Sequence, residues 1–339
     1  TLIERTQFEV MMMTKASVYV TRPIPVQIFD FLGDYDVEMN SEDRVLTRDE
    51  LLAKMKGRDA VLVISTIIDE EICRSVKAKC KIFSCYGVGY NNIDVESATK
   101  QGIYVTNTPD VVTDATADLA WTLLLATARR IVECDQFVRA GKKGWNPMNL
   151  VGTQVTGKTL GIVGGGRIGQ AVARRAQGFR MKVIYTDVQK MPAFEAATGG
   201  QFVDKETLFK SADFISVHAP LLPSTRHLIG ADEFKLMKKT AILINDARGP
   251  IVDEKALVEA LRKGQFAGAG LDVFEKEPDL MDGLSELPNV VLSPHVGTST
   301  TETRIEMAAV CARDIIAALN NQIPPNCLNP QAKSNQGIL

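Results

Sequence analysis

The chain of 339 residues is too long for one hydrophobic core of ordinary size, so we expect two domains. Its apolar (45%) and charged (24%) fractions are those of an ordinary globular protein, and 39 Lys and Arg residues nearly balance 41 Asp and Glu residues. This balance, without a basic cluster, argues against nucleic acid or a membrane surface as partner, and no apolar run approaches the ~20 residues of a membrane span.

The cysteines and histidines narrow the chemistry further. None of the six cysteines forms a CxxC pair, and their spacing suits neither a zinc site nor a dense set of disulfides. We therefore expect reduced thiols, no metal and a cytoplasmic location. Only three histidines occur, His218, His227 and His295. The triplet Met11-Met12-Met13 suggests that the native protein starts there, so residues 1–13 are predicted to be a leader or an added segment.

From Ser17 the chain alternates short β-branched runs with amphipathic stretches. Strands are predicted at 17–21, 60–64, 81–85 and 103–106, and helices between them include 47–56 and 69–78. This alternation predicts an open, mostly parallel α/β sheet.

A long helix is predicted over 114–140, with Thr113 as its N-cap. The apolar residues that share one face of this helix are Leu119, Leu123, Ala126 and Ile131. The polar stretch 141–155, which contains glycine and proline, is predicted to be a loop.

A second β-α series runs from Lys158 to about Leu292, and a helical tail covers 303–320. The two series predict two α/β domains, and the simplest use of the tail is to return to the first of them. We therefore expect one domain from residues 14–112 and 301–330, with residues 113–300 inserted in it as the second.

The second series opens with a glycine pattern typical of dinucleotide sites. An apolar strand leads into Gly164-Gly-Gly166-Arg-Ile-Gly169, and an Ala-rich helix follows. Gly164 permits a tight turn, Gly166 lets the backbone approach a pyrophosphate, and Gly169 allows close packing of helix and strand. The next strand ends at Asp187, whose carboxylate can accept hydrogen bonds from a ribose and would repel a 2′-phosphate. The pattern predicts NAD rather than NADP, although Lys190 could still contribute a cation.

Three residues that carry acid–base or ionic chemistry follow three consecutive predicted strands. They are Arg248, Glu277 and His295. A single residue of these types after a strand is usually a surface or turn residue. Because consecutive parallel strands end at one edge of a sheet, where ligands bind, we expect all three to lie together.

The reduction of a 2-oxo acid makes three demands that this set meets. Arg248 can bind the substrate carboxylate through two parallel hydrogen bonds. His295 can donate a proton to the ketone oxygen as hydride reaches C2, and Glu277 can orient the imidazole and favour its charged form. Of the other histidines, we expect His218 to line the cofactor cleft and His227 to be structural.

With these motifs the sequence resembles the D-isomer-specific 2-hydroxyacid dehydrogenases, over about residues 17–325. Besides the glycine-rich segment, the resemblance rests on His218-Ala-Pro-Leu, Asn245-Asp-Ala-Arg-Gly, Gly270-Leu-Asp-Val-Phe and Ser293-Pro-His-Val-Gly. It implies two doubly wound parallel-sheet domains, a flavodoxin-like substrate domain formed by both chain ends and a Rossmann NAD domain, with the active site in the cleft between them. It also implies that Arg248, Glu277 and His295 are the catalytic residues.

The same resemblance implies two sets of binding residues. Those that would contact NAD, besides Gly164, Gly166 and Gly169, are Thr116, Arg167, Ile168, Asp187, His218, Ala219, Pro220, Thr225, Asp246, Ala247, Asp272 and Gly297. Those that would contact the substrate, besides Arg248, are Ile64, Ser65, Val88, Gly89 and Trp145. The backbone N–H groups of Val88 and Gly89 would bind the substrate carboxylate. Asp246 stands where the family usually has an uncharged residue, but a backbone contact there would survive the change.

Within that family the likeness to glyoxylate/hydroxypyruvate reductases implies NAD(H)-dependent reduction of a small 2-oxo acid to the (R)-2-hydroxy acid. D-3-phosphoglycerate dehydrogenase is the alternative. Against it, Ile64 stands where phosphate-binding relatives carry Arg, and we expect no regulatory domain after Pro325. A non-enzymatic NAD(H)-sensing protein of the corepressor type would have little need of the full Arg-Glu-His set. A formate or phosphite dehydrogenase would share the hydride chemistry.

Trp145 lies in the predicted loop 141–155. By the same resemblance this loop would cross a homodimer interface, where Trp145 would help to shape the substrate pocket of the partner. The other interpretation is an aromatic ring that packs beneath the loop.

Overall fold

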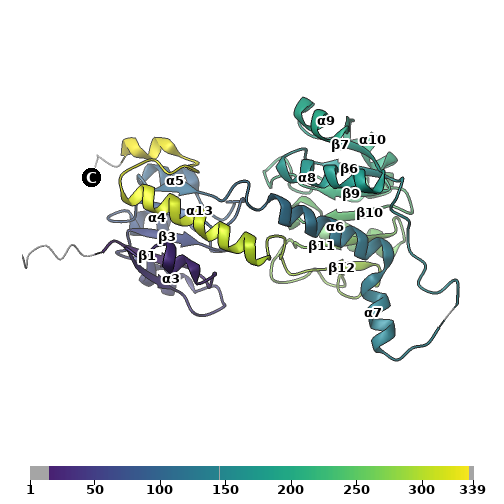
Figure 1. Cartoon of the computed structure of the whole chain (residues 1–339), viewed down its shortest axis with the longest axis horizontal. Helices are drawn as coiled ribbons and strands as arrows, with labels where there is room; N and C mark the ends of the chain where they lie inside the picture. The colour runs from purple at the N-terminus through teal and green to yellow at the C-terminus, as the bar shows by residue number, and fades with distance from the viewer. Residues whose placement is uncertain (1–14, 145, 336–339) are drawn as a thin grey trace, which may run out of the picture. The chain divides into compact units, whose positions relative to one another are not determined.

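The computed structural model describes residues 15–144 and 146–335, and the chain divides into two compact units. One unit contains residues 15–112 and 300–335, and the other is Thr113–Ser299. Each unit holds one parallel sheet with helices packed against it (Figure 1). Trp145 and the predicted leader lie outside the described residues. The predicted α/β fold with two parallel sheets is confirmed.

The first unit has a five-stranded sheet in the order β2-β1-β3-β4-β5, and every pair of neighbours is parallel. Its strands are β1 (Ser17–Val20), β2 (Asp36–Met39), β3 (Ala60–Val63), β4 (Ile82–Cys85) and β5 (Tyr104–Thr106). Its helices are α2 (Gln27–Phe31), α3 (Arg48–Met55), α4 (Glu70–Val76), α5 (Val95–Lys100), α13 (Thr301–Leu319) and the 3-10 helix η3 (Pro330–Asn335). This strand order is that of flavodoxin-like folds.

Helices cover both faces of this sheet, which explains why β1, β3 and β4 are buried at every residue. On one face Val20 and Ile82 pack against Met307 and Ile315 of α13. The helix from the end of the chain therefore completes the core that the first strands begin. The unpredicted strand β2 alternates charged and apolar residues and lies at the sheet edge, which is why its pattern is weak.

The second unit has a seven-stranded parallel sheet in the order β12-β11-β10-β9-β6-β7-β8. Its strands are β6 (Thr159–Val163), β7 (Lys182–Thr186), β8 (Gln201–Phe202), β9 (Phe214–Val217), β10 (Ile242–Asn245), β11 (Gly268–Leu271) and β12 (Val290–Leu292). Its helices are α6 (Thr113–Arg129), α7 (Ile131–Arg139), α8 (Arg167–Arg175), η1 (Ala176–Phe179), α9 (Pro192–Thr198), α10 (Lys205–Ser211), α11 (Ala231–Leu236), η2 (Gly249–Ile251) and α12 (Glu254–Arg262). Counted from β6, the order is that of a Rossmann fold with one added strand.

The predicted single helix over 114–140 is wrong, because the chain forms α6 and α7 with a break at Arg130, whose φ is +53°. The carbonyl of Ala128 accepts a hydrogen bond from the N–H of Thr153 (2.7 Å), a distant residue that caps the end of α6. Thr113 is the first residue of α6 rather than a cap before it. Ile131 was expected on the buried face but is 55% exposed, because it lies beyond the break.

The described residues contain no group of three or more metal-ligating side chains that could hold an ion. All six cysteines carry free thiols, and Cys73, Cys80, Cys85 and Cys311 are buried. Within residues 15–144 and 146–335, no helix combines the length and apolar character that crossing a bilayer requires.

Asn329 ties the last segment of the chain to the sheet of the first unit. It is fully buried, and its Oδ1 accepts a hydrogen bond from the N–H of Val105 (2.7 Å). Its Nδ2 donates to Oγ1 of Thr99 (2.8 Å) and to the carbonyl of Ile103 (3.0 Å).

Replacing Asn329 with Ala should lower the free energy of unfolding by about 2–4 kcal/mol, because two buried backbone groups lose their partners. Urea unfolding measures the change. The control Asn335→Ala removes a single partly buried bond to the carbonyl of Thr99 and should cost under about 1 kcal/mol. Equal losses in the two variants would contradict the assignment.

Candidate active site

The loops that follow the strands of the seven-stranded sheet lie along its carboxyl edge in the order of the strands. Asp187 follows β7, the glycine turn follows β6, and His218 follows β9. The loops after β10, β11 and β12 then carry the predicted catalytic residues. The strand order therefore lines up the predicted adenosine, pyrophosphate and catalytic groups along one edge.

The glycine turn after β6 requires the absence of side chains at two positions. Gly164 has a φ of +98°, and a Cβ there would lie 2.6 Å from the backbone nitrogen of Ala219. A Cβ at Gly169 would lie 2.1 Å from the carbonyl oxygen of Gly164. A Cβ at Gly166 would meet no described atom within 4 Å, so the backbone there is open to a ligand. The turn and the N-terminus of α8, at Arg167 and Ile168, fit a pyrophosphate.

Asp187 is held beside this turn. Its Oδ2 accepts a hydrogen bond from the N–H of Gly165 (2.8 Å) and its Oδ1 from the N–H of Val188 (2.7 Å). Each carboxylate oxygen keeps a second lone pair, which a ribose hydroxyl can use. The cation that the sequence offers to a 2′-phosphate, Lys190, forms an ion pair with Glu195 (3.2 Å).

His218 and Asp246, both predicted to contact the cofactor, form a buried pair. His218 Nδ1 lies 3.3 Å from Asp246 Oδ1, and the two side chains are 1% and 0% exposed. On the other side of the ring, Nε2 lies 2.8 Å from Oγ of Ser216. No described residue is aligned to donate a hydrogen bond to either oxygen of Asp246, so the carboxylate depends on the nearby imidazole for compensation.

The predicted acid–base pair is formed. Glu277 Oε2 lies 2.7 Å from His295 Nδ1, and its Oε1 accepts a hydrogen bond from the N–H of Phe274 (3.0 Å). Burial alone would raise the pKa of Glu277, but the hydrogen bond to His295, the backbone donor and the charge of Arg248 outweigh it, so the pKa lies below its usual value. The His295 side chain is 47% exposed, and its Nε2 has no partner in the described part of the chain.

Asp272 holds the turn that carries His295. Its Oδ1 accepts hydrogen bonds from Ser293 Oγ (2.6 Å) and the N–H of Val296 (2.9 Å), and its Oδ2 from the N–H of Gly297 (2.8 Å). Its carbonyl accepts the N–H of His295 (2.8 Å), whose φ is +54°. Asp272 is fully buried, and burial raises its pKa. Because a left-handed histidine is strained, these four bonds stabilise the orientation of the ring.

Arg248 follows β10 in a turn that Asn245 closes. Asn245 Oδ1 accepts the N–H of Ala247 (3.1 Å) and its Nδ2 donates to the carbonyl of Arg248 (3.1 Å). Arg248 Nη1 donates to the carbonyl of Ala247 (2.6 Å). A Cβ at the next residue, Gly249, would lie 2.0 Å from the carbonyl carbon of Phe274. The Arg248 turn therefore packs directly against the loop that carries Glu277.

Two further predicted cofactor residues, Thr116 and Thr225, contact other residues of the chain at this edge. Cγ2 of Thr116, in the first turn of α6, lies 3.6 Å from the position of a Cβ on Gly297. Thr225 closes its own turn, since its Oγ1 donates to the carbonyl of Pro220 (2.6 Å) and accepts the N–H of Leu222 (2.8 Å). Their contacts with NAD stay predictions.

The sequence reasoning missed the supporting roles of Asn245, Ser293 and Glu254. Glu254, in the first turn of α12, is buried and accepts the N–H of Glu275 (2.8 Å). Asn245 and Ser293 each lie within motifs that carried the family resemblance, so their motifs were the available signal. For Glu254 the only signal is its place after the N-cap Asp253.

The predicted substrate residues of the first unit lie at the carboxyl edge of its own sheet. Ile64 donates its N–H to Thr21 Oγ1 (2.9 Å), and Ser65 has a φ of +46°. The carbonyl of Val88 accepts a hydrogen bond from Asn107 Nδ2 (2.7 Å). The N–H groups of Val88 and Gly89 have no acceptor among the residues that the structure describes, so they are available to an anion.

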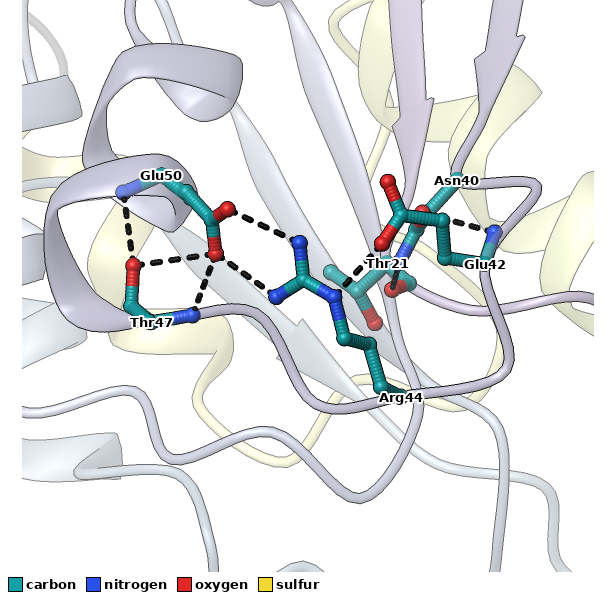
Figure 2. Close-up of polar contacts among 6 residues, drawn as sticks. All are labelled: Thr21, Asn40, Glu42, Arg44, Thr47 and Glu50. Atoms are coloured by element: carbon teal, nitrogen blue, oxygen red, sulfur yellow. Dashed lines mark hydrogen bonds and ion pairs between the residues drawn. The ribbon is translucent and has the colours of Figure 1, made fainter.

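Figure 2 shows polar contacts in the segment that joins β2 to α3 in the first unit. Asn40 Nδ2 donates to the carbonyl of Thr21 (3.1 Å), and Arg44 binds both carboxylate oxygens of Glu50 (2.8 Å each). These ion pairs are exposed, so each contributes little to stability. Their effect is to fix the course of the loop beside Thr21.

Comparisons with known proteins indicate the family of the chain. The family model "D-isomer specific 2-hydroxyacid dehydrogenase, NAD binding domain" matches residues 121–297. A glyoxylate reductase of Thermococcus litoralis is 51% identical over 322 residues, which cover 93% of this chain and 97% of that protein.

Two solved structures extend the likeness to the whole fold. The glyoxylate reductase of Paecilomyes thermophila has a TM-score of 0.84 at 32% identity, over 94% of this chain and 100% of that one. The NADPH-dependent glyoxylate/hydroxypyruvate reductase of Sinorhizobium meliloti, solved with NADP and malonate, has a TM-score of 0.80 at 30% identity, over 94% of this chain and 98% of that one.

Replacing Gly249 with Ala should reduce kcat/KM for a 2-oxo acid by about 10²-fold or more, since a displacement near 1 Å at a catalytic group has this effect. The new methyl group would overlap the backbone at Phe274 and displace the loop that presents Glu277. Steady-state kinetics measure the loss. In the control Gly178→Ala, the Cβ meets no described atom within 4 Å. Full activity in Gly249→Ala would show that the close approach is not needed.

Proposed function

The chain belongs to the D-isomer specific 2-hydroxyacid dehydrogenase family, and we propose that it reduces glyoxylate or hydroxypyruvate with NADH and with His295 as proton donor. The product would be the 2-hydroxy acid, of (R) configuration where C2 is a stereocentre. The observation that carries the proposal is the 2.7 Å contact between Glu277 and His295 at the sheet edge that also carries Arg248.

The three side chains have separate tasks in this reaction. Bound NADH would supply the hydride to C2 of the substrate. Arg248 binds the substrate carboxylate, and His295 donates a proton from Nε2 to the ketone oxygen. Glu277 accepts the hydrogen bond of Nδ1–H and so orients the ring, and its lowered pKa keeps it ionised.

The substrate assignment is supported by the relatives and by one residue of the first unit. The Thermococcus and Paecilomyes proteins are named glyoxylate reductases. The aliphatic side chain of Ile64 cannot compensate a phosphate, which favours glyoxylate or hydroxypyruvate over 3-phosphohydroxypyruvate. The roles of Ile64, Ser65, Val88, Gly89 and Trp145 in substrate binding stay predictions.

The preference for NAD over NADP is supported by Asp187, which would repel a 2′-phosphate, and by the pairing of Lys190 with Glu195. The Sinorhizobium relative is named NADPH-dependent, so the preference is not a property of every member of the family.

A homodimer is supported by α7. None of its residues, all within the described part, is buried, and Ile131, Val132 and Val138 are exposed. Figure 1 shows α7 extending away from the sheet of the second unit. An apolar helix face of this kind is typical of a contact with another subunit, and a second copy of the chain is the partner we propose. Residence in the cytoplasm stays a prediction.

The proposed reaction is tested by offering glyoxylate, hydroxypyruvate, pyruvate and 3-phosphohydroxypyruvate to the protein with NADH and following absorbance at the NADH band. We expect the highest kcat/KM with one of the first two. His295→Ala should lower kcat by about 10²–10⁴-fold with the preferred acid, because the proton donor is lost. Preference for the phosphorylated acid would support the phosphoglycerate dehydrogenase alternative, and undiminished turnover in His295→Ala would reject its role.

Replacing Asp187 with Ser should raise the ratio of kcat/KM for NADPH over NADH by about 10²–10³-fold, since like charges about 4 Å apart repel by up to about 4 kcal/mol at an effective dielectric of 20. Kinetics with both cofactors measure the ratio. Lys190→Ala is the control, and because its cation is paired on the surface the ratio should change by less than about threefold. If Asp187→Ser leaves the ratio unchanged, Asp187 does not set the preference.

A further inference from the structure

His227 is the one histidine of the chain that neither the proposed chemistry nor the cofactor site uses. It lies between β9 and α11 with a φ of +50°, and its N–H donates to the carbonyl of Pro250 (2.8 Å). Pro250 follows the Arg248–Gly249 turn directly. His227 is therefore fixed by its backbone beside the predicted catalytic edge.

The side chain of His227 pairs with Glu275, in the same loop as Glu277. His227 Nε2 is hydrogen-bonded to Glu275 Oε1, and the two side chains are 38% and 13% exposed. The backbone N–H of Glu275 donates to Glu254 Oε1 (2.8 Å). Two residues later in the chain, Glu277 contacts His295. The loop is thus held between two histidine–carboxylate pairs.

Carboxylates crowd around this loop, so the pair of His227 with Glu275 matters for its structure. Burial raises the pKa of Glu254, and the nearby carboxylates of Glu275 and Glu277 raise it further. Glu254 therefore lies close to two other carboxylates, and each of these has a histidine as its hydrogen-bond partner, His227 for Glu275 and His295 for Glu277. Without His227, the largely buried carboxylate of Glu275 would lose this hydrogen bond.

We propose that His227 is a positioning residue for the reductase reaction, acting through Glu275 to hold residues 273–278 so that Glu277 meets His295. The imidazole does not touch the reacting atoms in this assignment. Its effect reaches the reaction along the backbone from Glu275 to Glu277. The kinetic part of this inference rests on the proposed function, whereas its structural part does not.

The kinetic test is a double-mutant cycle. His227→Ala should lower kcat by about 3–30-fold, because contacting groups of one network couple by this much, and should leave KM for NADH unchanged. In the Glu277→Gln background the same substitution should change kcat by less than about twofold. His227→Gln, which can still donate to Glu275, should recover most of the loss. If the effects of His227→Ala and Glu277→Gln on kcat simply multiply, the proposal is overturned. A residue that only stabilises the fold would give this result, because its effect does not depend on Glu277.

The matched control is Lys238→Ala. Lys238 pairs with Asp213 (2.9 Å), which precedes β9 at the opposite edge of the sheet, and the two side chains are 38% and 17% exposed. Asp213 also accepts a backbone N–H, that of Thr159 (2.9 Å). The control therefore removes an ion pair of similar exposure that lies far from the loop 273–278. Its kcat should stay within about twofold of the wild type. An equal loss in both variants would overturn the proposal.

A second measurement separates this inference from the proposed function. Hydrogen–deuterium exchange of residues 273–278 should speed up in His227→Ala by about tenfold or more, because local opening exposes the bonded N–H groups of Phe274 and Glu275. Exchange in α8 should not change. If the protein reduces none of the acids offered, the proposed function fails, and the exchange result still decides whether His227 holds the loop. Unchanged exchange would overturn the inference.

Discussion

The hydrogen bond between Glu277 and His295 joins the loops after two neighbouring strands, and most of the surrounding structure holds its two ends. On one side, Asp272 collects four hydrogen-bond donors and keeps His295 in a left-handed conformation that would otherwise be unfavourable. On the other, the N–H of Phe274 and the charge of Arg248 keep Glu277 ionised. Both partners are therefore oriented before any substrate arrives, which is the condition for effective acid–base chemistry.

The strand order of the second unit sets the order in which the predicted cofactor and catalytic residues lie along the sheet edge. Asp187 and the glycine turn lie after β7 and β6, while the predicted catalytic residues follow β10, β11 and β12. β9 separates the two groups, so a dinucleotide that extends from one to the other must pass over the loop that follows it. His218 begins this loop, and its buried contact with Asp246 joins the ends of β9 and β10.

Short-range patterns in the sequence predicted the two sheets, the glycine turn and the three residues of the catalytic edge, because each of these depends on a few consecutive residues. The features that were missed depend on distant partners. The break between α6 and α7 comes from a hydrogen bond between Ala128 and Thr153. The contact of His227 with Glu275, which lies 48 positions away, has no signal in the neighbouring residues. The hydrogen bonds of the Asp272 carboxylate to the turn that carries His295 also join residues more than 20 positions apart, and its contact with NAD stays a prediction.

The division of the first unit between the two ends of the chain affects how it folds during synthesis. Its five strands leave the ribosome early, but α13, which covers Val20 and Ile82, comes only after the whole of Thr113–Ser299. At ordinary elongation rates that interval is roughly 10–40 s. For this time the side chains that α13 later covers lack that helix, whereas the inserted unit can fold from one continuous segment. The core of the first unit therefore stays incomplete until the last part of the chain has been made.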